Sequence, residues 1–317
     1  MNKNEKTTSS SSMRGKINFT GQAPLMAVIS AIGVVLALGL IFTKGFTYGI
    51  DFAGGTEVQV QFTEAVEVAQ VRQFTDDLGY KNATVQAFGE DNEFLIRLEA
   101  AKGKDDKETN KMNNETIQKV TEALKAQMPL AADGIRRVDS VGPQIGDELK
   151  RNGLLAVFYC LLMILIYVGL RFDYKYAPGA VLCLFHDAII VLGVFSLIEH
   201  EVNVTILAAI LTIIGYSLND TIVNFDRIRE NEDVYKGKAL DMIVNRSIND
   251  VLSRTILTSV TTMLAVLCLY FLAGGVITDF ALALGIGVVV GTYSSIYVAS
   301  PIVLVVQKMM DNRKSAA

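Results

Sequence analysis

Six apolar blocks, each long enough to cross a lipid bilayer, constrain the fold of this chain more than any other feature. About 20 predominantly apolar residues span roughly 30 Å of hydrocarbon. The hydrophobic residues, 51% of the chain, gather in blocks at 24–43, 154–170, 178–198, 204–223, 255–273 and 280–306. We therefore predict an α-helical membrane protein with six transmembrane helices, the first at 23–43 and the other five in a bundle at 153–306. The last block is overlong, and Pro301 is expected to kink or end it.

The distribution of Lys and Arg predicts the orientation of the chain. One set of segments, made of residues 1–22, 171–177, 224–254 and 307–317, holds 15 of these residues, whereas 199–203 and 274–279 hold none. By the positive-inside rule we expect a disordered cytoplasmic tail at 1–22, a cytoplasmic loop at 224–254 and a cytoplasmic tail at 307–317. Both termini are then cytoplasmic and 44–152 is external. The first block is too long for a signal peptide, so it is expected to remain as an anchor.

The external segment 44–152 alternates between two periodicities. Period-two or strand-like runs at 56–62, 83–88, 94–98 and 135–141 are separated by helical patterns at 67–78 and 114–128. The order βαββαβ predicts one α+β domain of the ferredoxin-like type between helices 1 and 2. Residues 102–114 are expected to form an exposed loop. The segment has 19 acidic and 14 basic residues, which argues against nucleic-acid binding.

This plan contains a single repeat, one external domain followed by five closely spaced helices. Transporters are commonly built from paired repeats with the working site at the interface between them. We therefore expect a partner subunit with the same plan.

The block 204–223 contains Asp220, an ionisable residue inside the membrane. Such a residue costs about 2.5 to 3.5 kcal/mol at the bilayer centre and usually marks an ion or proton path. At about 1.5 Å per residue, Asp220 lies roughly 25 Å from the external end of its helix, close to the depth of Arg254 on the next helix. An Asp220–Arg254 pair is therefore allowed. His186 and Asp187 in the third block also fall in the inner half of the membrane.

Polar residues accompany Asp220 on its helix and on the next. Tyr216, Ser217 and Asn224 share its face at spacings of three and four, and the fifth block offers hydroxyls for a relay at Thr258, Ser259, Thr261 and Thr262. An adjacent cation favours a charged carboxylate and dehydration a neutral one, so a change of surroundings can switch its protonation. The alternative is that these groups only hold helices together, and that Arg254 reaches the cytoplasmic interface.

Other motifs offer little chemistry. Gly287 and Gly291 form a GxxxG typical of helix packing. The stretch 49–56 (GIDFAGGT) lacks the GK[ST] of a phosphate loop and leads into a strand, so a tight turn is the better interpretation. No metal-binding or nucleophile constellation is evident. We expect neither a metal, nor a cofactor, nor an enzyme.

Several stretches together resemble the SecF side of the SecD/SecF family of protein-export membrane proteins. They are 49–56 (GIDFAGGT), 141–146 (VGPQIG), 215–223 (GYSLNDTIV), 226–231 (DRIREN), 253–255 (SRT) and 295–299 (SIYVA). The resemblance covers most of the chain. It marks a structural motif at Gly49, Asp51, Gly54, Gly55, Thr56, Gly142 and Pro143.

The resemblance implies a subunit of the bacterial cytoplasmic (inner) membrane that works with a SecD-like partner and docks on the SecYEG channel. Such a subunit uses the proton-motive force to pull an unfolded polypeptide outward, after the ATP-driven step of SecA, and it contacts membrane lipid. The family's intramembrane acid falls on Asp220 and its arginine on Arg254. With Asn219, Asp187 and His186 these form the candidate proton relay.

Our hypothesis is that protonation of Asp220 loosens its pairing with Arg254, so that the helices rearrange and the external domain moves. Two other functions stay open. One is a proton-coupled exporter of lipid or small molecules, although such proteins usually have large domains in both external loops of each half. The other is a passive scaffold that stabilises a translocon, with the charges holding helices together.

Overall fold

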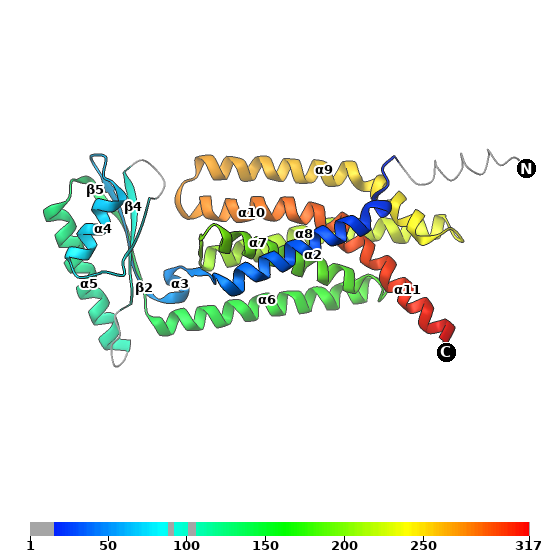
Figure 1. The fold of residues 1–317 in the computed structure, drawn as a ribbon, viewed down its shortest axis with the longest axis horizontal. Helices are drawn as coiled ribbons and strands as arrows, with labels where there is room; N and C mark the ends of the chain where they lie inside the picture. Colours follow the sequence, from blue (N-terminus) through cyan, green and yellow to red (C-terminus); the bar gives the residue numbers. More distant parts are fainter. Residues whose placement is uncertain (1–15, 88–91, 101–105, 317) are drawn as a thin grey trace, which may run out of the picture.

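The computed structural model describes residues 16–87, 92–100 and 106–316. Within them, six helices are long and apolar enough to cross a membrane. Five are α2 (Phe19–Thr43), α6 (Pro143–Arg171), α7 (Ala177–Leu197), α8 (Val204–Val234) and α9 (Leu240–Leu272). The sixth is a continuous stretch of α10 (Gly275–Ser294), the π-helix η1 (Ser295–Ala299) and α11 (Ser300–Ala316). The predicted number of membrane-spanning helices is thus found (Figure 1).

The helices extend beyond the apolar blocks, which corrects several predicted boundaries. Residues 224–254, expected as a loop, form a helical hairpin in which α8 ends at Val234 and α9 starts at Leu240. Polar contacts between the two helices hold the extension, because Arg227 pairs with Asp250 at 2.7 Å and Asn231 Nδ2 donates to Ser247 Oγ at 2.9 Å. Hydropathy detects the apolar part of a helix but not its polar continuation.

Three further predicted boundaries are wrong because the helices continue beyond their apolar parts. Helix α6 already begins at Pro143, inside the segment expected to be external, and α2 begins at Phe19, inside the expected tail. The predicted disorder of 1–15 lies outside the described residues. At the other end, 307–316 is helical. Pro301 does not end the last helix, which continues through it, but the helix changes direction between α10 and α11 (Figure 1), as the predicted kink requires.

A four-stranded sheet and two helices form a separate unit at one end of the molecule. The elements are β2 (Gly55–Phe62), α4 (Val68–Asp77), β3 (Thr84–Ala87), β4 (Glu93–Leu98), α5 (Asp106–Gln127) and β5 (Leu130–Val141). The sheet order is β3-β4-β2-β5, and every neighbouring pair is antiparallel. Both helices cover the face of the sheet that is turned away from the bundle (Figure 1). The apolar core of this unit lies between the helices and the sheet and includes Val58, Val60, Ile96, Val120 and Leu124. Of the loop expected at 102–114, residues 106–114 belong to α5 and 102–105 lie outside the described residues.

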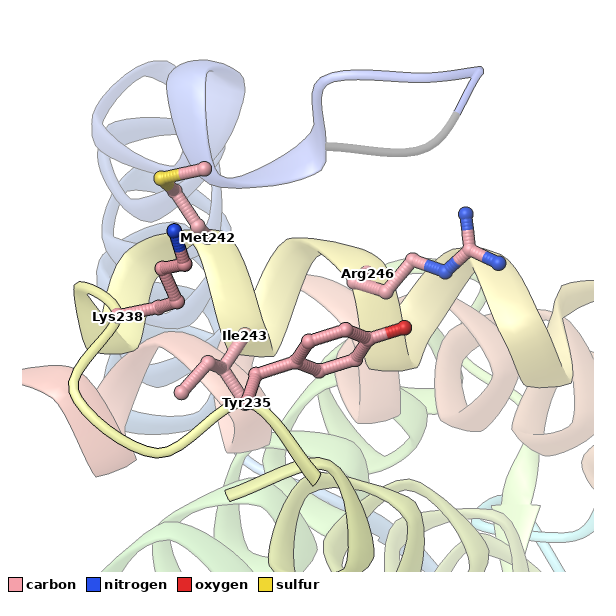
Figure 2. A pocket seen from close by; sticks show the side chains of 5 residues that line it. All are labelled: Tyr235, Lys238, Met242, Ile243 and Arg246. Atoms are coloured by element: carbon pink, nitrogen blue, oxygen red, sulfur yellow. The ribbon is translucent and has the colours of Figure 1, made fainter. Parts of the chain in front are cut away.

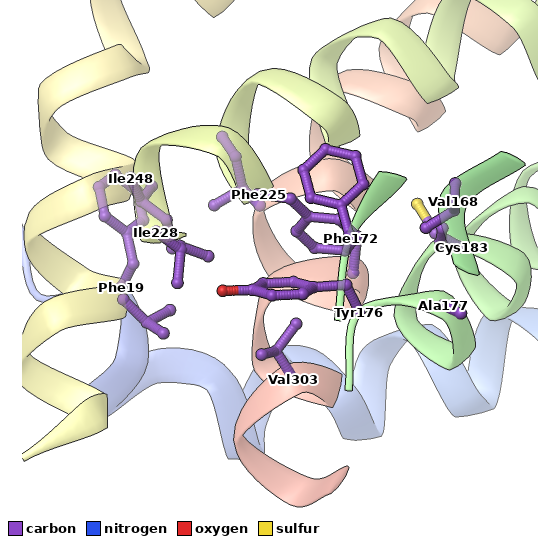
Figure 3. Close-up of a cluster of buried hydrophobic side chains, with 14 residues drawn as sticks. Phe19, Val168, Phe172, Tyr176, Ala177, Cys183, Phe225, Ile228, Ile248 and Val303 are labelled. Carbon is purple, nitrogen blue, oxygen red and sulfur yellow. The ribbon is translucent and has the colours of Figure 1, made fainter. Parts of the chain in front are cut away.

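Helices α7 and α8 form the centre of the bundle. In their most apolar windows 56% and 44% of the residues are buried, against 11% in α2 and in α9. At the end far from the sheet, an apolar core joins α6, α7, α8 and α9 to α11 (Figure 3). There Tyr176 packs against Phe225 with ring centroids 5.0 Å apart. Gly287 and Gly291 lie where α10 meets α8, against Ile213 and Ser217, as the packing interpretation expects.

Two openings lie at opposite ends of the bundle. A small pocket at the α8–α9 turn is lined by Tyr235, Lys238, Met242, Ile243 and Arg246 (Figure 2). Its volume of about 10 Å³ suits at most a single water molecule. A cleft of about 930 Å³ separates the uncovered face of the sheet from the turn between α9 and α10. The sheet is therefore not packed on the bundle along this face.

Candidate functional site

Helix α8 buries a stripe of polar side chains in the bundle centre. Ser217, Asp220, Thr221 and Asn224 are all buried, at spacings of three and four residues that place them on one side of the helix. Their neighbours come from α7, α9 and the α10–η1 segment. Two distinct polar clusters result, one around Asp187 and one around Asp220.

The first cluster is a fully hydrogen-bonded carboxylate. Asp187 on α7 has an exposed fraction of 0%. Its Oδ2 accepts from Ser217 Oγ on α8 at 2.5 Å and from Ser294 Oγ on α10 at 2.9 Å. Its Oδ1 lies 2.9 Å from His186 Nδ1. One carboxylate thus connects three helices, as buried polar groups with complete hydrogen bonding can.

Further groups extend this cluster on both sides. The Cys183 thiol donates to Ser294 Oγ at 3.2 Å. On the other side, the ring of His186 lies 6.2 Å from that of Tyr293, whose hydroxyl is 2.9 Å from Ser30 Oγ on α2. His186 is 8% exposed, so it lies at the edge of the cluster.

The second cluster contains a buried carboxylate without a hydrogen bond. Asp220 is 3% exposed, and its Oδ2 has no hydrogen-bond partner within the described residues. One turn further along α8, Asn224 Nδ2 donates to the carbonyl of Ser295 at 3.2 Å, while Asn224 Oδ1 also lacks a partner there. Buried polar atoms are usually satisfied, so each exception needs an explanation.

The π-helix lies beside this unsatisfied pair of side chains. Ser295 is the first residue of η1, and its carbonyl accepts from Asn224 and from Ser300 Oγ, the latter at 2.9 Å. A π-helical turn interrupts the regular ladder of a helix and is frequent at functional sites. The chain therefore has a π-helical turn in contact with Asn224, which lies one turn along α8 from the unsatisfied carboxylate.

The predicted contact between Asp220 and Arg254 is not formed. No ion pair joins them within the described parts of the chain, and the Arg254 side chain is exposed. Arg254 is still near enough for its charge to act on Asp220. Counting residues along the helices predicts the depth of each side chain but not the side of α9 on which Arg254 lies.

The other predicted relay residues divide between the interior and the surface. Asn219 is exposed on α8 and faces away from its neighbour Asp220, because successive helical residues point in different directions. Of the hydroxyls on α9, Ser259 crosses to α10, lying 2.7 Å from Thr292 Oγ1, and it accepts from Tyr216 at 3.5 Å. Thr258 and Thr261 instead donate to carbonyls of their own helix.

Sequence reasoning missed the contribution of the last block. Ser294 donates its hydroxyl to Asp187, Ser295 accepts from Asn224 through its carbonyl, and Thr292 pairs with Ser259 on α9. Three hydroxyl residues within four positions of an apolar block were the available signal. This signal is weak, because small hydroxyl residues also occur routinely where membrane helices pack.

The structural-motif residues meet at the junction between sheet and bundle. The chain passes from α2 through β1 (Thr47–Tyr48) and the short helix α3 (Ile50–Ala53) into β2. The stretch 49–56, interpreted from the sequence as a tight turn, therefore includes one turn of helix. Gly54 and Gly55 have φ of 73° and 133°, a region that favours glycine. A Cβ on Gly54 would lie 3.0 Å from Pro143.

The two glycine-containing motifs are in direct contact at this junction. Pro143 is the first residue of α6, with Gly142 as its N-cap, and a Cβ on Gly146 would lie 3.1 Å from the Phe52 carbonyl. Thr56 is buried at the start of β2, with its hydroxyl 3.2 Å from Ser140. Gly49 donates its N–H to the carbonyl of Val202 at 3.0 Å, where β1 pairs with β6 (Glu201–Val202).

Comparisons with known proteins agree with this arrangement. A family model described as protein export membrane protein SecD/SecF, C-terminal, matches residues 119–309, and one described as the SecD/SecF GG motif matches 39–66. The protein translocase subunit SecF of Calditerrivibrio nitroreducens is 43% identical over 92% of this chain and 95% of its own. SecF of Pseudomonas aeruginosa is 42% identical over 92% and 91%.

A solved structure gives the same result. The crystal structure of SecDF, described as a translocon-associated membrane protein of Thermus thermophilus, superposes with a TM-score of 0.82 at 39% identity, covering 92% of this chain and 39% of that one. Fold and junction together define a multi-pass bacterial membrane protein of the SecD/SecF type. The chain belongs to the SecF family of protein translocase subunits, whose SecDF relatives carry the SecD part on the same polypeptide.

Proposed function

We propose that this chain, together with a SecD-like partner, uses the proton-motive force to drive late steps of protein export across the cytoplasmic membrane. The observation that carries the proposal is Asp220, a carboxylate buried inside a membrane span with an unpartnered oxygen. An intramembrane carboxylate that merely joined helices would be expected to have the hydrogen bonds that Asp187 has.

The energies involved are of matching size. A charge at the bilayer centre costs about 2.5 to 3.5 kcal/mol. Moving one elementary charge across 100 mV supplies about 2.3 kcal/mol. Binding or releasing one proton at Asp220 therefore changes the energy of the bundle by an amount that the membrane potential can supply.

The geometry favours a division of roles within the predicted relay. Asp220 is the group that changes its protonation, while Asp187 and His186 hold α7, α8 and α10 together beside it. Asn219 and Arg254, both exposed at membrane depth, face the SecD-like partner. Polar groups exposed to lipid are costly, so a partner helix that binds them has a clear energetic basis.

Orientation and partners complete the proposal. The sheet unit lies at one end of the bundle, and the start of α2 and the whole of α11 lie at the other (Figure 1). We infer that the sheet unit is a ferredoxin-like domain on the external side and that both termini are cytoplasmic, in agreement with the Lys and Arg distribution. The SecYEG channel, an emerging unfolded polypeptide and membrane lipid are its further partners. The subunit carries no catalytic chemistry of its own.

The test is the gradient-dependent part of export. The pair with its SecD-like partner is reconstituted with SecYEG and SecA, and export is measured with and without a proton gradient, along with proton flux. Asp220→Asn should abolish both the gradient-dependent part and the flux while leaving assembly with the partner intact. Asp233→Asn, an exposed carboxylate on the same helix, is the matched control and should change neither.

An unchanged flux and an unchanged gradient response in Asp220→Asn would exclude the proposal and favour the passive scaffold. Flux that persists without any effect on polypeptide export would instead favour transport of a lipid or another small molecule.

A further inference from the structure

The sheet unit is connected by the chain to α2 and α6, but not to α8. The links are β1 and α3 on one side and the passage from β5 into α6 on the other. Helix α8, which carries Asp220, begins only after the α7–α8 turn. A movement of α8 therefore reaches the sheet unit through side-chain and strand contacts, or through other helices.

One contact binds the first residue of α8. Asp51 Oδ2, on α3, accepts the backbone N–H of Val204 at 3.0 Å, while the N-cap side chain of Asn203 accepts from Ile206 at 3.0 Å. The first N–H groups of a helix lack intrahelical partners, and a carboxylate near them is favoured by the helix dipole. Only Gly54 separates α3 from β2, so Asp51 connects α8 to the sheet almost directly.

A second contact joins the sheet face to the same turn. Arg97 on β4 pairs with Glu57 on β2 at 2.5 Å and with Glu201 on β6. The side chains of Arg97 and Glu201 are each only 13% exposed. A partly buried arginine between two carboxylates is held more firmly than an exposed pair, because little water competes and the guanidinium binds through several N–H groups.

The two contacts lie side by side, and the surrounding sheet face is open. Glu201 lies three positions before Val204, on strand β6, which pairs in parallel with β1. Beyond Arg97, the cleft of about 930 Å³ separates the sheet from the α9–α10 turn. The attachment of the sheet face to the bundle is therefore concentrated at the start of α8.

We infer that Asp51 and Arg97 are positioning residues that attach the sheet unit to the start of α8 and pass movements of that helix to it. The attachment itself rests on the contacts above. The claim that proton binding drives the movement rests on the proposed function, so the two are tested by separate measurements.

The Asp51 contact is tested by hydrogen exchange at the Val204 amide in the complex with the SecD-like partner. Loss of a capping acceptor in Asp51→Ala should accelerate exchange roughly fivefold. Asp51→Asn retains a capping oxygen and should restore slow exchange. The Ile206 amide, bound by Asn203, is the internal control. Equal exchange at Val204 in the parent and in Asp51→Ala would overturn this contact.

The Arg97 contact is tested by the distance between spin labels at K125C on α5 and I277C on α10, with Cys160 and Cys268 replaced by serine. The parent should give one narrow distance distribution. Arg97→Met and Glu201→Gln should each lose it, and the double variant should be no broader than either, because both remove one interaction. Lys44→Met, which breaks an exposed ion pair with Glu199 on the same turn, is the matched control and should keep the narrow distribution.

The coupling between movement of α8 and the sheet unit is tested by measuring gradient-dependent export. Arg97→Met and Asp51→Ala should reduce the gradient-dependent part of export while proton flux through the pair continues, and Asp51→Asn should recover it. Full gradient-dependent export in Arg97→Met, with a broadened distance, would overturn the coupling role. Loss of flux in Asp220→Asn supports the proposed function independently of these results, and its failure would leave the distance and exchange results standing.

Discussion

Two carboxylates buried in the same helical bundle have opposite surroundings. Asp187 has two hydroxyl donors and a histidine, whereas Asp220 on the adjacent helix has an oxygen without any partner within the described residues. A carboxylate whose acceptor sites are filled stabilises one arrangement of the helices around it. An unsatisfied one gains a partner when it binds a proton or when the helices move. The comparison teaches that burial alone does not distinguish the two carboxylates, whereas their hydrogen bonding does.

The largest expected effect on stability comes from removing the satisfied carboxylate. Asp187→Ala leaves Ser217, Ser294 and His186 without their shared acceptor and should lower the free energy of unfolding by about 2 to 3 kcal/mol. Asp220→Asn should change it by less than about 0.5 kcal/mol, because it breaks no hydrogen bond. The midpoint of thermal unfolding in detergent measures both. Equal losses of stability in the two variants would show that the two carboxylates do not differ in their contribution to the fold.

A smaller effect should follow from moving Ser217 without removing any polar group. Gly291→Ala places a Cβ 3.1 Å from the Ser217 Cβ, which pushes α8 and α10 apart at Asp187. Overpacking of this kind costs about 1 to 3 kcal/mol. Gly215→Ala on α8, where an added Cβ meets nothing within 4 Å, is the matched control. The same thermal measurement should show a loss in Gly291→Ala alone.

Removing one of the donors to Asp187 should cost less again. Ser217→Ala is expected to destabilise the bundle by about 1 kcal/mol, because Ser294 and His186 still bind the carboxylate. In an Asp187→Ala background the same substitution should add little, since the shared interaction is already lost. Full additivity of the two changes would show that the hydrogen bond contributes nothing.

The smallest effect is expected at an exposed carboxylate with a partner. Hydrogen bonding and the charge of Lys44 lower the pKa of Glu199 below its ordinary value of 4.5. Its contribution to stability is therefore present above that value and is lost as the pH falls through the lowered pKa of the folded state. Lys44→Met should abolish this acid-limb dependence, measured by unfolding at a series of pH values: its stability should be slightly below that of the parent near neutral pH and equal to it in acid.

Much of the architecture could be predicted from the sequence, because apolar length and strand periodicity are local properties. The six apolar helices, the alternation of strands and helices in 44–152 and the carboxylate of Asp220 within an apolar stretch all follow from short stretches of sequence. The polar extension of α8 and α9 into a hairpin could not be predicted from short stretches, because it depends on the pairing of Arg227 with Asp250, which lie 23 positions apart in the sequence. The roles of Thr292, Ser294 and Ser295 were missed for another reason, because small hydroxyl residues are common wherever membrane helices pack.

The sequence by itself determined which segments are long and apolar enough to span a membrane, how far along each segment a polar residue lies, and to which family the chain is similar. Only the tertiary structure decided which of them meet: that Asp187 is satisfied and Asp220 is not, that Arg254 and Asn219 face outward, and that Asp51 binds the start of α8. Depth follows from the fixed rise of a helix along its own axis. Direction and partnership depend on how each helix is rotated against its neighbours, which the packing of the whole bundle sets.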